Sequence, residues 1–276
     1  MRTIKRYSDV LNKNKIKAVQ QTATAYTKEK KFWLGIFQQL QYMGYIKKHR
    51  VIRNQFVANQ YQSPYKLQAR MWKLALIDAA ETMDKYWQSI FDQVKSAIYR
   101  NKNLTEIKRH YCFWLLKDYQ KLPSIFQGKP FEFKEMNDQD RMHPIHFLKR
   151  TIKKYRKSYP TTKLSRSFAL DDNCYSCFEH HGKQYIKVMS LKRAERITLP
   201  LKGYTPIQGN IRVIIKDKVI DLHYTASLKK PVLHDHHELV GIDLGYTEVL
   251  TDHLGNCYLE NLKILIDVYL LGVGAD

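Results

Sequence analysis

The residue whose type and setting best suit chemistry is Asp243, within the string Gly-Ile-Asp-Leu-Gly at 241–245. Apolar runs separated by glycine turns predict three short antiparallel strands around it. The expected strands cover residues 239–242, 249–251 and 257–259. A carboxylate anchored by a buried strand keeps its position when a divalent ion and a phosphate crowd it. Asp243 is therefore a candidate metal ligand, and the alternative is a solvated aspartate at a strand end.

The same five-residue string also opens the folds of sugar kinases and chaperone ATPases. In those folds the string begins the domain and a nucleotide-binding core follows it. Here 33 of the 276 residues follow Asp243, and no second phosphate-binding loop is visible. A fragment of an actin-like or kinase-like ATPase is therefore the remote alternative.

A second concentration of chemistry-bearing residues is basic. Six cations fall within nine positions: Lys149, Arg150, Lys153, Lys154, Arg156 and Lys157. Apolar residues recur at helical spacing across 144–159, which predicts a helix with one apolar face and a strongly basic remainder. Like charges this dense repel one another unless phosphates lie alongside, although a charge run is also typical of a solvated face. We expect a nucleic-acid backbone contact here, and a further one at Lys192 and Arg193.

Cysteine and histidine residues at 174–181 offer ligand types that zinc prefers, but their spacing does not suit a zinc site. Structural zinc sites separate their ligand pairs by a dozen or so residues. In an alternating strand, Cys174 and Cys177 would also lie on opposite faces. We expect no zinc, reduced thiols throughout, and a solvated linker at the His-Asp-His-His run of 234–237.

Composition restricts the class of protein. A content of 44% hydrophobic and 12% aromatic residues is typical of a globular chain. Lys and Arg total 47 against 26 Asp and Glu, a formal charge of +21 that favours a polyanionic partner. No apolar stretch reaches the ~18 residues of a membrane span, and no secretory leader is visible. We expect a cytoplasmic protein with no membrane partner.

Periodicity predicts a helical first half after a short lone strand at 3–7. An amphipathic helix should contain Phe32, Ile36, Leu40 and Met43, and a long helix should begin at Ser63-Pro64. The long helix should end at 101–103, and two further helices are expected at 106–119 and 144–159. Aromatic residues at helical spacing, such as Trp72 and Trp87, are interpreted as core.

From residue 165 the period changes to alternation. Strands are predicted at 173–179, 184–190, 196–199, 211–216 and 218–224. Short strands separated by Gly and Pro turns favour a small β-barrel. The fold class is therefore α+β, in four parts: residues 1–12, 13–164, 165–232 and 233–276.

This order of parts, together with the stretch Gly-Ile-Asp-Leu-Gly-Tyr-Thr-Glu-Val-Leu-Thr-Asp at 241–252, resembles the transposon-encoded TnpB (OrfB) proteins, relatives of type V CRISPR effectors. Two further stretches are similar to that family: 71–87 and 197–203. The resemblance implies a first wedge strand at 1–12, a helical recognition block, a wedge barrel of OB-like type, and the first strands of an RNase H-like (RuvC) domain.

The resemblance also implies a function. Family members are RNA-guided DNA endonucleases that bind guide RNA and DNA in the prokaryotic cytoplasm, in association with the nucleoid. Asp243 matches the first RuvC carboxylate, and in such sites about three carboxylates hold two Mg²⁺ ions. The family's later carboxylates and four-cysteine zinc motif have no counterpart after the third predicted strand.

From that departure we expect an incomplete RuvC segment, a truncated or frameshifted product, and no DNA cleavage by the chain alone. Whether the chain is an enzyme is left open at this point. The alternative function is a non-catalytic nucleic-acid-binding regulator that uses only the helices and the barrel.

Overall fold

A computed structural model describes residues 2–162, 166–226, 242–243, 248–252 and 257–260 of the chain. Residues 1–228 form one compact unit, and residues 229–276 form a second. Within the described residues the fold is α+β, with seven α-helices and antiparallel sheets. The predicted subdivision of the first unit at residues 12 and 164 stays a prediction.

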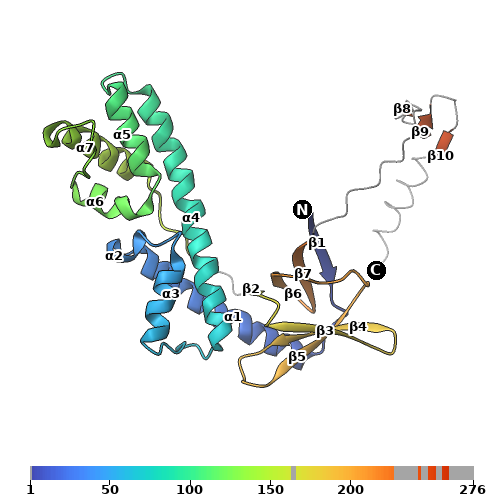
Figure 1. The fold of residues 1–276 in the computed structure, drawn as a ribbon. Coiled ribbons are helices and arrows are strands. Elements are labelled where there is room, and N and C mark those ends of the chain that lie inside the picture. The colour runs from blue at the N-terminus through green and yellow to red at the C-terminus, as the bar shows by residue number, and fades with distance from the viewer. Residues whose placement is uncertain (1, 163–165, 227–241, 244–247, 253–256, 261–276) are drawn as a thin grey trace. The chain divides into compact units, whose positions relative to one another are not determined.

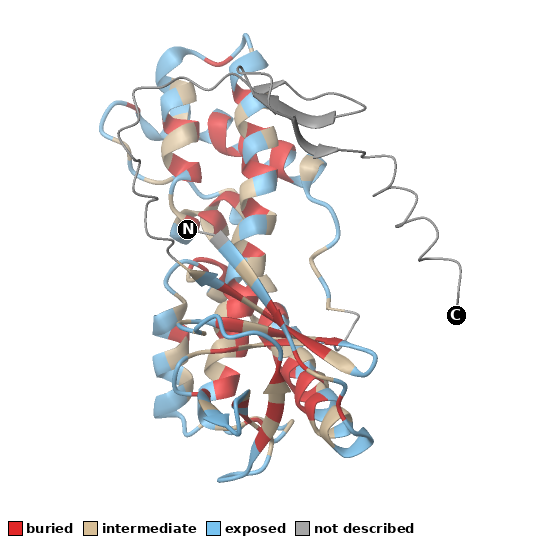
Figure 2. Ribbon diagram, turned by 90° about the vertical axis from the view of Figure 1, so that its right-hand side faces the viewer, coloured by how far each residue is buried: buried red, intermediate tan, exposed pale blue. Residues whose placement is uncertain are grey.

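The helices occupy most of the first 155 residues (Figure 1). Their bounds are α1 Lys13–Gln38, α2 Leu40–Met43, α3 His49–Ala58, α4 Ala69–Arg100, α5 Glu106–Leu116, the 3-10 turn η1 Tyr119–Lys121, α6 Leu122–Gln127 and α7 Asp138–Tyr155. Helices α1 and α4 pack along each other, while α5, α6 and α7 gather around one end of α4. Buried side chains lie where helices and strands face one another (Figure 2).

A buried carboxylate organises the packing of α1 against α4. Glu29 Oε1 accepts hydrogen bonds from Trp33 Nε1 and Tyr61 Oη, both at 2.9 Å, and its Oε2 accepts one from Ser63 Oγ at 2.5 Å. Around this carboxylate, the Trp33 and Trp72 rings stack with centroids 5.7 Å apart. Burial raises the pKa of Glu29, although these three hydrogen bonds oppose the rise. Trp72 is 3% exposed, which confirms its interpretation as core.

The prediction that the long helix begins at Ser63-Pro64 is wrong. Helix α4 begins at Ala69 with Gln68 as its N-cap. The Ser63 hydroxyl instead donates to Glu29 and accepts from the Tyr65 amide at 3.2 Å. A tertiary hydrogen bond therefore replaces the local helix cap that the Ser-Pro pair predicts.

Two other helix bounds also differ from prediction. The expected continuous helix through Phe32 and Met43 breaks at Gln39, whose backbone is extended, so α2 is separate from α1. Helix α7 begins at Asp138, six residues before the predicted start, and carries Pro144 in its interior.

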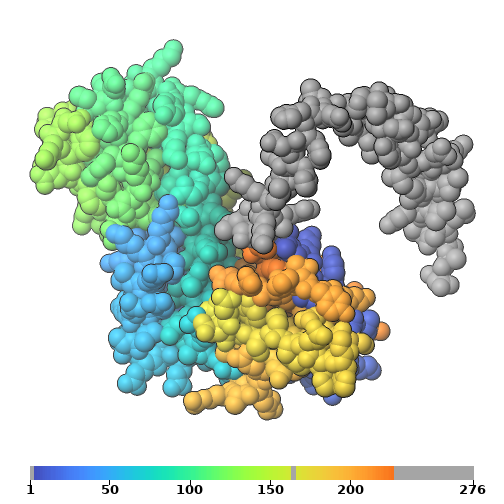
Figure 3. All heavy atoms as spheres, turned by 45° about the vertical axis from the view of Figure 1, so that its right-hand side comes forward, coloured from blue at the N-terminus to red at the C-terminus, as the bar shows by residue number. Residues whose placement is uncertain are grey.

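The strands of the first unit form two antiparallel sheets. One has the order β1-β7-β6-β2 and the other β3-β4-β5. The bounds are β1 Arg2–Tyr7, β2 Ser167–Leu170, β3 Tyr175–His180, β4 Lys183–Met189, β5 Arg196–Leu201, β6 Ile211–Lys216 and β7 Val219–Ala226. The first strand is therefore not a lone strand, because all six of its residues pair with β7. The space-filling view shows residues 166–226, which contain β2 to β7, in yellow to orange against the helices (Figure 3).

The expected closed barrel is wrong. Among the described residues, backbone hydrogen bonds join the two sheets where the end of β1 meets the end of β5, from Lys202 N to Tyr7 O at 2.8 Å and from Asp9 N to Pro200 O at 3.1 Å. The other two edge strands, β2 and β3, follow each other in the chain but pair with β6 and β4 respectively. Since those edges do not pair, the sheet path stays open.

Two hairpin turns fall in the gaps between predicted strands, at 179–184 and 216–218. Gly182, between β3 and β4, has a φ of 70°, and Asp217, between β6 and β7, has a φ of 46°. At the junction of β1 and β5, the buried guanidinium of Arg6 donates to the carbonyls of Lys202, Gly203 and Thr205. Arg6 therefore ties the loop after β5 to the first strand.

The described residues of the second unit form the three strands that the sequence predicts. They are β8 Ile242–Asp243, β9 Glu248–Asp252 and β10 Cys257–Glu260, in an antiparallel sheet of order β10-β9-β8. Asp243 pairs in register with Thr251. The 234–237 linker lies outside the described residues.

Candidate nucleic-acid interface

The predicted basic helix exists as the second half of α7. Its apolar face is buried against α4, α5 and α6 through Ile145, Leu148 and Ile152, all at 0% exposure. At the opposite end from its charges, Asn137 caps the helix by accepting a hydrogen bond from Asp140 N at 2.8 Å. Packing therefore fixes which face of α7 is presented to solvent.

All six predicted cations are exposed. Lys149, Arg150, Lys153 and Lys154 lie on the helix, whereas Arg156 is its C-cap and Lys157 follows it. We call this set the α7 basic ridge. None of the six forms an ion pair with another described residue.

Part of this charge also has a local structural role. Cations in the last helical turn, here Lys153 and Lys154, interact favourably with the negative end of the helix dipole. The Arg156 guanidinium lies 5.9 Å from the Phe126 ring and 5.6 Å from the Tyr159 ring. Lys149 and Arg150 precede that last turn, so the helix dipole does not account for their positive charges.

A second basic surface, which sequence reasoning missed, follows α1. A groove of about 830 Å³ runs between α1, residues 64–66 and the loop from β4 to β5. Five exposed lysines line it: Lys13, Lys17, Lys28, Lys66 and Lys192. A neighbouring hollow of about 640 Å³ continues along the same helix and shares Lys28 and Tyr65 with the groove, and Lys31 also lines it. We call these two hollows together the α1 groove.

The α1 groove has a consistent chemical character. Among its lining residues there is no Asp or Glu, and its floor includes Ile16, Ala25 and Leu191. Of the described residues, none forms an ion pair with Lys13, Lys17 or Lys28. A polyanion would therefore meet uncompensated lysines beside an apolar surface.

Helical geometry explains why these lysines share one side of α1. At about 100° per residue, Lys13, Lys17, Lys28 and Lys31 fall within roughly 60° of arc. The side chains of Val19, Tyr26, Trp33 and Phe37 lie on the other side of the helix, where they are buried. In the sequence these lysines belong to two short basic clusters, 13–17 and 28–31, and the helix brings members of both onto one side.

The two other predicted cations, Lys192 and Arg193, lie in the loop from β4 to β5 and are exposed. Gln68 Nε2, just before α4, donates to Ser190 O at 2.7 Å and to Lys192 O at 3.1 Å, which holds this loop at the end of the α1 groove. Lys192 also pairs with Glu195 at 3.3 Å. The structure therefore joins Lys192 to the α1 lysines, while the α7 basic ridge lines a different part of the unit.

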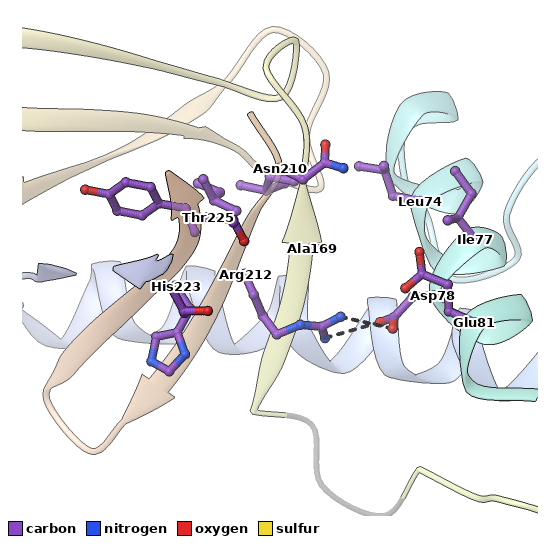
Figure 4. Close-up of a pocket in the computed structure, with 13 residues that line it drawn as sticks. Leu74, Ile77, Asp78, Glu81, Ala169, Asn210, Arg212, His223 and Thr225 are labelled. Carbon is purple, nitrogen blue, oxygen red and sulfur yellow. Dashed lines mark hydrogen bonds and ion pairs between the residues drawn. The ribbon is translucent and has the colours of Figure 1, made fainter. Parts of the chain in front are cut away.

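A pocket of about 270 Å³ lies where α4 faces the four-stranded sheet, and Asp78 and Arg212 line it (Figure 4). Asp78 Oδ1 lies 3.0 Å from Arg212 Nη2 and 3.1 Å from Lys30 Nζ. Burial raises the pKa of Asp78, but the hydrogen bonds and charges of Arg212 and Lys30 outweigh it, so that the pKa lies below its ordinary value. This cluster is an ion pair that joins the helices to the sheet.

The candidate metal ligand, Asp243, is described only by its backbone position in β8. The described residues contain no group of three or more His, Cys, Asp or Glu side chains able to hold a metal ion. A two-ion site needs about three such carboxylates. We therefore derive no catalytic step through a metal, and Mg²⁺ binding stays a prediction.

Three cysteines are free thiols in the described ranges: Cys112 and Cys174 are buried, and Cys177 is exposed. Burial raises the pKa of Cys112 and of Cys174 to about 12, which keeps both thiols protonated. No helix of the described chain combines the length and apolarity needed to cross a membrane.

No protein-family model matches the chain, and no curated protein is found to be similar to it. The resemblance of the stretch at 241–252 therefore stays a prediction. Function is therefore inferred from the surfaces of the first unit.

Proposed function

We propose that this chain binds nucleic acid through the α1 groove and the α7 basic ridge, in the manner of a TnpB-like transposon-associated protein. The observation that supports this most is the α1 groove, where exposed lysines gather and no Asp or Glu is among the lining residues. The formal charge of +21 agrees with a polyanionic partner. Lysines at this spacing would contact phosphates, so these two surfaces would provide affinity and orientation but no specificity for base sequence.

In this proposal the partners are guide RNA and DNA, in the prokaryotic cytoplasm and close to the nucleoid. That identification is based on the sequence resemblance alone. The same resemblance gives Asp243 the role of a Mg²⁺ ligand in DNA cleavage. Mg²⁺-dependent plasmid cleavage that Asp243→Ala abolishes would support this role and contradict the expectation that the chain alone does not cut DNA.

A non-catalytic regulator is the second candidate. Both basic surfaces lie in residues 1–228, which pack as one unit, while Asp243 belongs to the second unit. If nucleic-acid binding is unchanged in Asp243→Ala and no cleavage occurs, the regulator is favoured.

The test of the shared proposal is binding of labelled RNA and DNA, followed by fluorescence anisotropy over a range of salt concentrations. We expect tight binding at low salt that weakens steeply as salt rises, because each neutralised phosphate releases counterions. Absence of binding at low ionic strength would refute the proposal.

A further inference from the structure

The hairpin of β3 and β4 carries a pair of aromatic rings that no basic surface described above includes (Figure 1). Phe178 of β3 lies opposite Tyr185 of β4 in register. Their ring centroids are 5.2 Å apart and their planes differ by 16°, so the rings stack. The Lys187 ammonium lies 4.7 Å from the centroid of the Phe178 ring.

These two rings are not part of the hydrophobic core. Both are half-buried, and neither is among the described hydrophobic residues that pack against the core, whereas Met189 on the same strand is. The residues that alternate with them, such as Ile186 and Leu199, are fully buried on the other face of the sheet. The pair therefore lies on the outer face of the hairpin.

The charge on this outer face is of one sign. The rows beside the aromatic pair place Lys183 opposite His180 and Lys187 opposite Ser176. The acidic residue of β3, Glu179, alternates onto the opposite face, where it accepts a hydrogen bond from Gln184 Nε2 at 2.7 Å. A stacked cross-strand pair alone would stabilise the hairpin, but that role requires neither the flanking lysines nor a face without acids.

We propose that this face, Phe178 and Tyr185 with Lys183 and Lys187, binds a single-stranded nucleic acid by stacking its bases on the ring pair. The lysines, one residue row to each side of the rings, contact the phosphates that flank the stacked bases. Aromatic rings in a basic, acid-free setting suit single strands because every base offers a flat face, whereas bases in a duplex are already stacked. The inference rests on the proposed nucleic-acid binding and adds a selectivity for unpaired strands.

The test uses the full chain and measures fluorescence anisotropy with three probes of one length. These are a single-stranded RNA, a single-stranded DNA, and a single-stranded DNA with abasic sites in its middle. The variant Phe178→Leu/Tyr185→Leu removes stacking but keeps apolar bulk. The control Tyr99→Leu removes an aromatic residue that is 70% exposed on α4, and thermal unfolding checks that each variant folds.

Wild-type protein should bind the base-bearing DNA about tenfold more tightly than the abasic strand, since stacking gives a factor of that order per base. The double variant should lose about tenfold on base-bearing strands and little on the abasic strand, while Tyr99→Leu changes neither. Equal losses on base-bearing and abasic strands would overturn the inference. Equal affinity of wild-type protein for the base-bearing and the abasic DNA would also overturn the inference. That result needs no variant and does not contradict the proposed function. If wild-type protein binds none of the probes, the proposed function fails as well.

Discussion

Neutralising three lysines of the α1 groove is the most direct test of the proposed interface. The triple variant Lys13→Gln/Lys17→Gln/Lys28→Gln removes three exposed charges from one side of α1. Glutamine has nearly the helix propensity of lysine, so α1 should keep its stability. The changed positions lie opposite the buried face that packs on α4, and the core is left intact.

The size of the effect follows from geometry and counterion release. Lys13 and Lys28 are separated by about 22 Å along the helix axis, which spans about six base steps of one strand. If each lysine neutralises one phosphate of a single strand, the slope of log K against log salt becomes shallower by about 2. At about 0.1 M salt this corresponds to roughly a 100-fold loss of affinity, and to more on a duplex.

The assay is equilibrium anisotropy at several salt concentrations, with wild type and a charge-matched control side by side. The control, Lys102→Gln/Lys117→Gln/Lys218→Gln, removes the same net charge from exposed positions that do not line the α1 groove. It should change the slope little, because scattered charges act mainly through long-range attraction, which salt screens. If both triple variants lower the slope equally, or if neither does, the groove does not contact phosphates and the reasoning fails.

Three further predictions concern the ridge and the two buried carboxylates. Lys149→Gln/Arg150→Gln, the pair before the last turn of α7, should lower the salt slope by about 1.4 on single strands, and an unchanged slope would mean that α7 carries a solvated face. Asp78→Asn should reduce the free energy of unfolding by about 2–3 kcal/mol, below the ~3–5 of a fully buried pair, because the Arg212 side chain is 39% exposed. Since the folded pKa of Asp78 is lowered, its stabilisation is present above the ordinary carboxyl pKa of about 4 and disappears as pH falls through the lower value. Urea titrations of wild type and Asp78→Asn should therefore converge at acid pH, and a difference that does not depend on pH would contradict the ion-pair assignment. Glu29→Ala should cost about 3 kcal/mol by leaving donors such as Trp33 Nε1 without an acceptor, while Glu29→Gln should be tolerated near neutral pH. The folded pKa of Glu29 is raised, so its ionised form costs stability as pH rises, and Glu29→Gln should remove that pH dependence. Equal destabilisation by the two Glu29 substitutions would count against this account.

Sequence periodicity predicts the elements well and their partners poorly. The long helix α4, the two hairpin turns and the three strands around Asp243 follow from local patterns, because local backbone preference decides them. The start of α4 depends on a distant residue, because the Ser63 hydroxyl donates a hydrogen bond to Glu29, which is 34 residues away in the chain. Whether the sheets close into a barrel depends likewise on which edge strands pair. Short alternating strands are equally compatible with open sheets and with a barrel, so their pattern does not decide it.

The two basic surfaces also differ in how far the sequence predicts them. The α7 basic ridge is visible in the sequence as a dense run of cations, whereas the α1 groove is assembled from one side of a helix, the 64–66 segment and the β4–β5 loop. Of the lysines in that groove, only Lys192 was predicted as a nucleic-acid contact. The α1 lysines belong to two short basic clusters of the sequence, 13–17 and 28–31, which only the helix brings onto one side. Distant segments come together there through Gln68, whose amide holds the β4–β5 loop beside the start of α4.

The position of the α1 lysines depends on the buried side of the same helix. Glu29 accepts hydrogen bonds from Tyr61 and Ser63 in the segment before α4, and the Trp33 ring stacks on Trp72 of α4, so these contacts fix the rotation of α1 about its axis. Tyr26 extends toward Phe168 of the sheet, with ring centroids 6.3 Å apart. A rotation of α1 would bury lysine ammonium groups and expose the Trp33 ring, both of which cost free energy. The hydrogen bonds of one buried carboxylate therefore help to hold in place the row of lysines for which we propose phosphate contacts. Removing that carboxylate with Glu29→Ala should weaken nucleic-acid binding by the protein that remains folded, although no surface charge is changed.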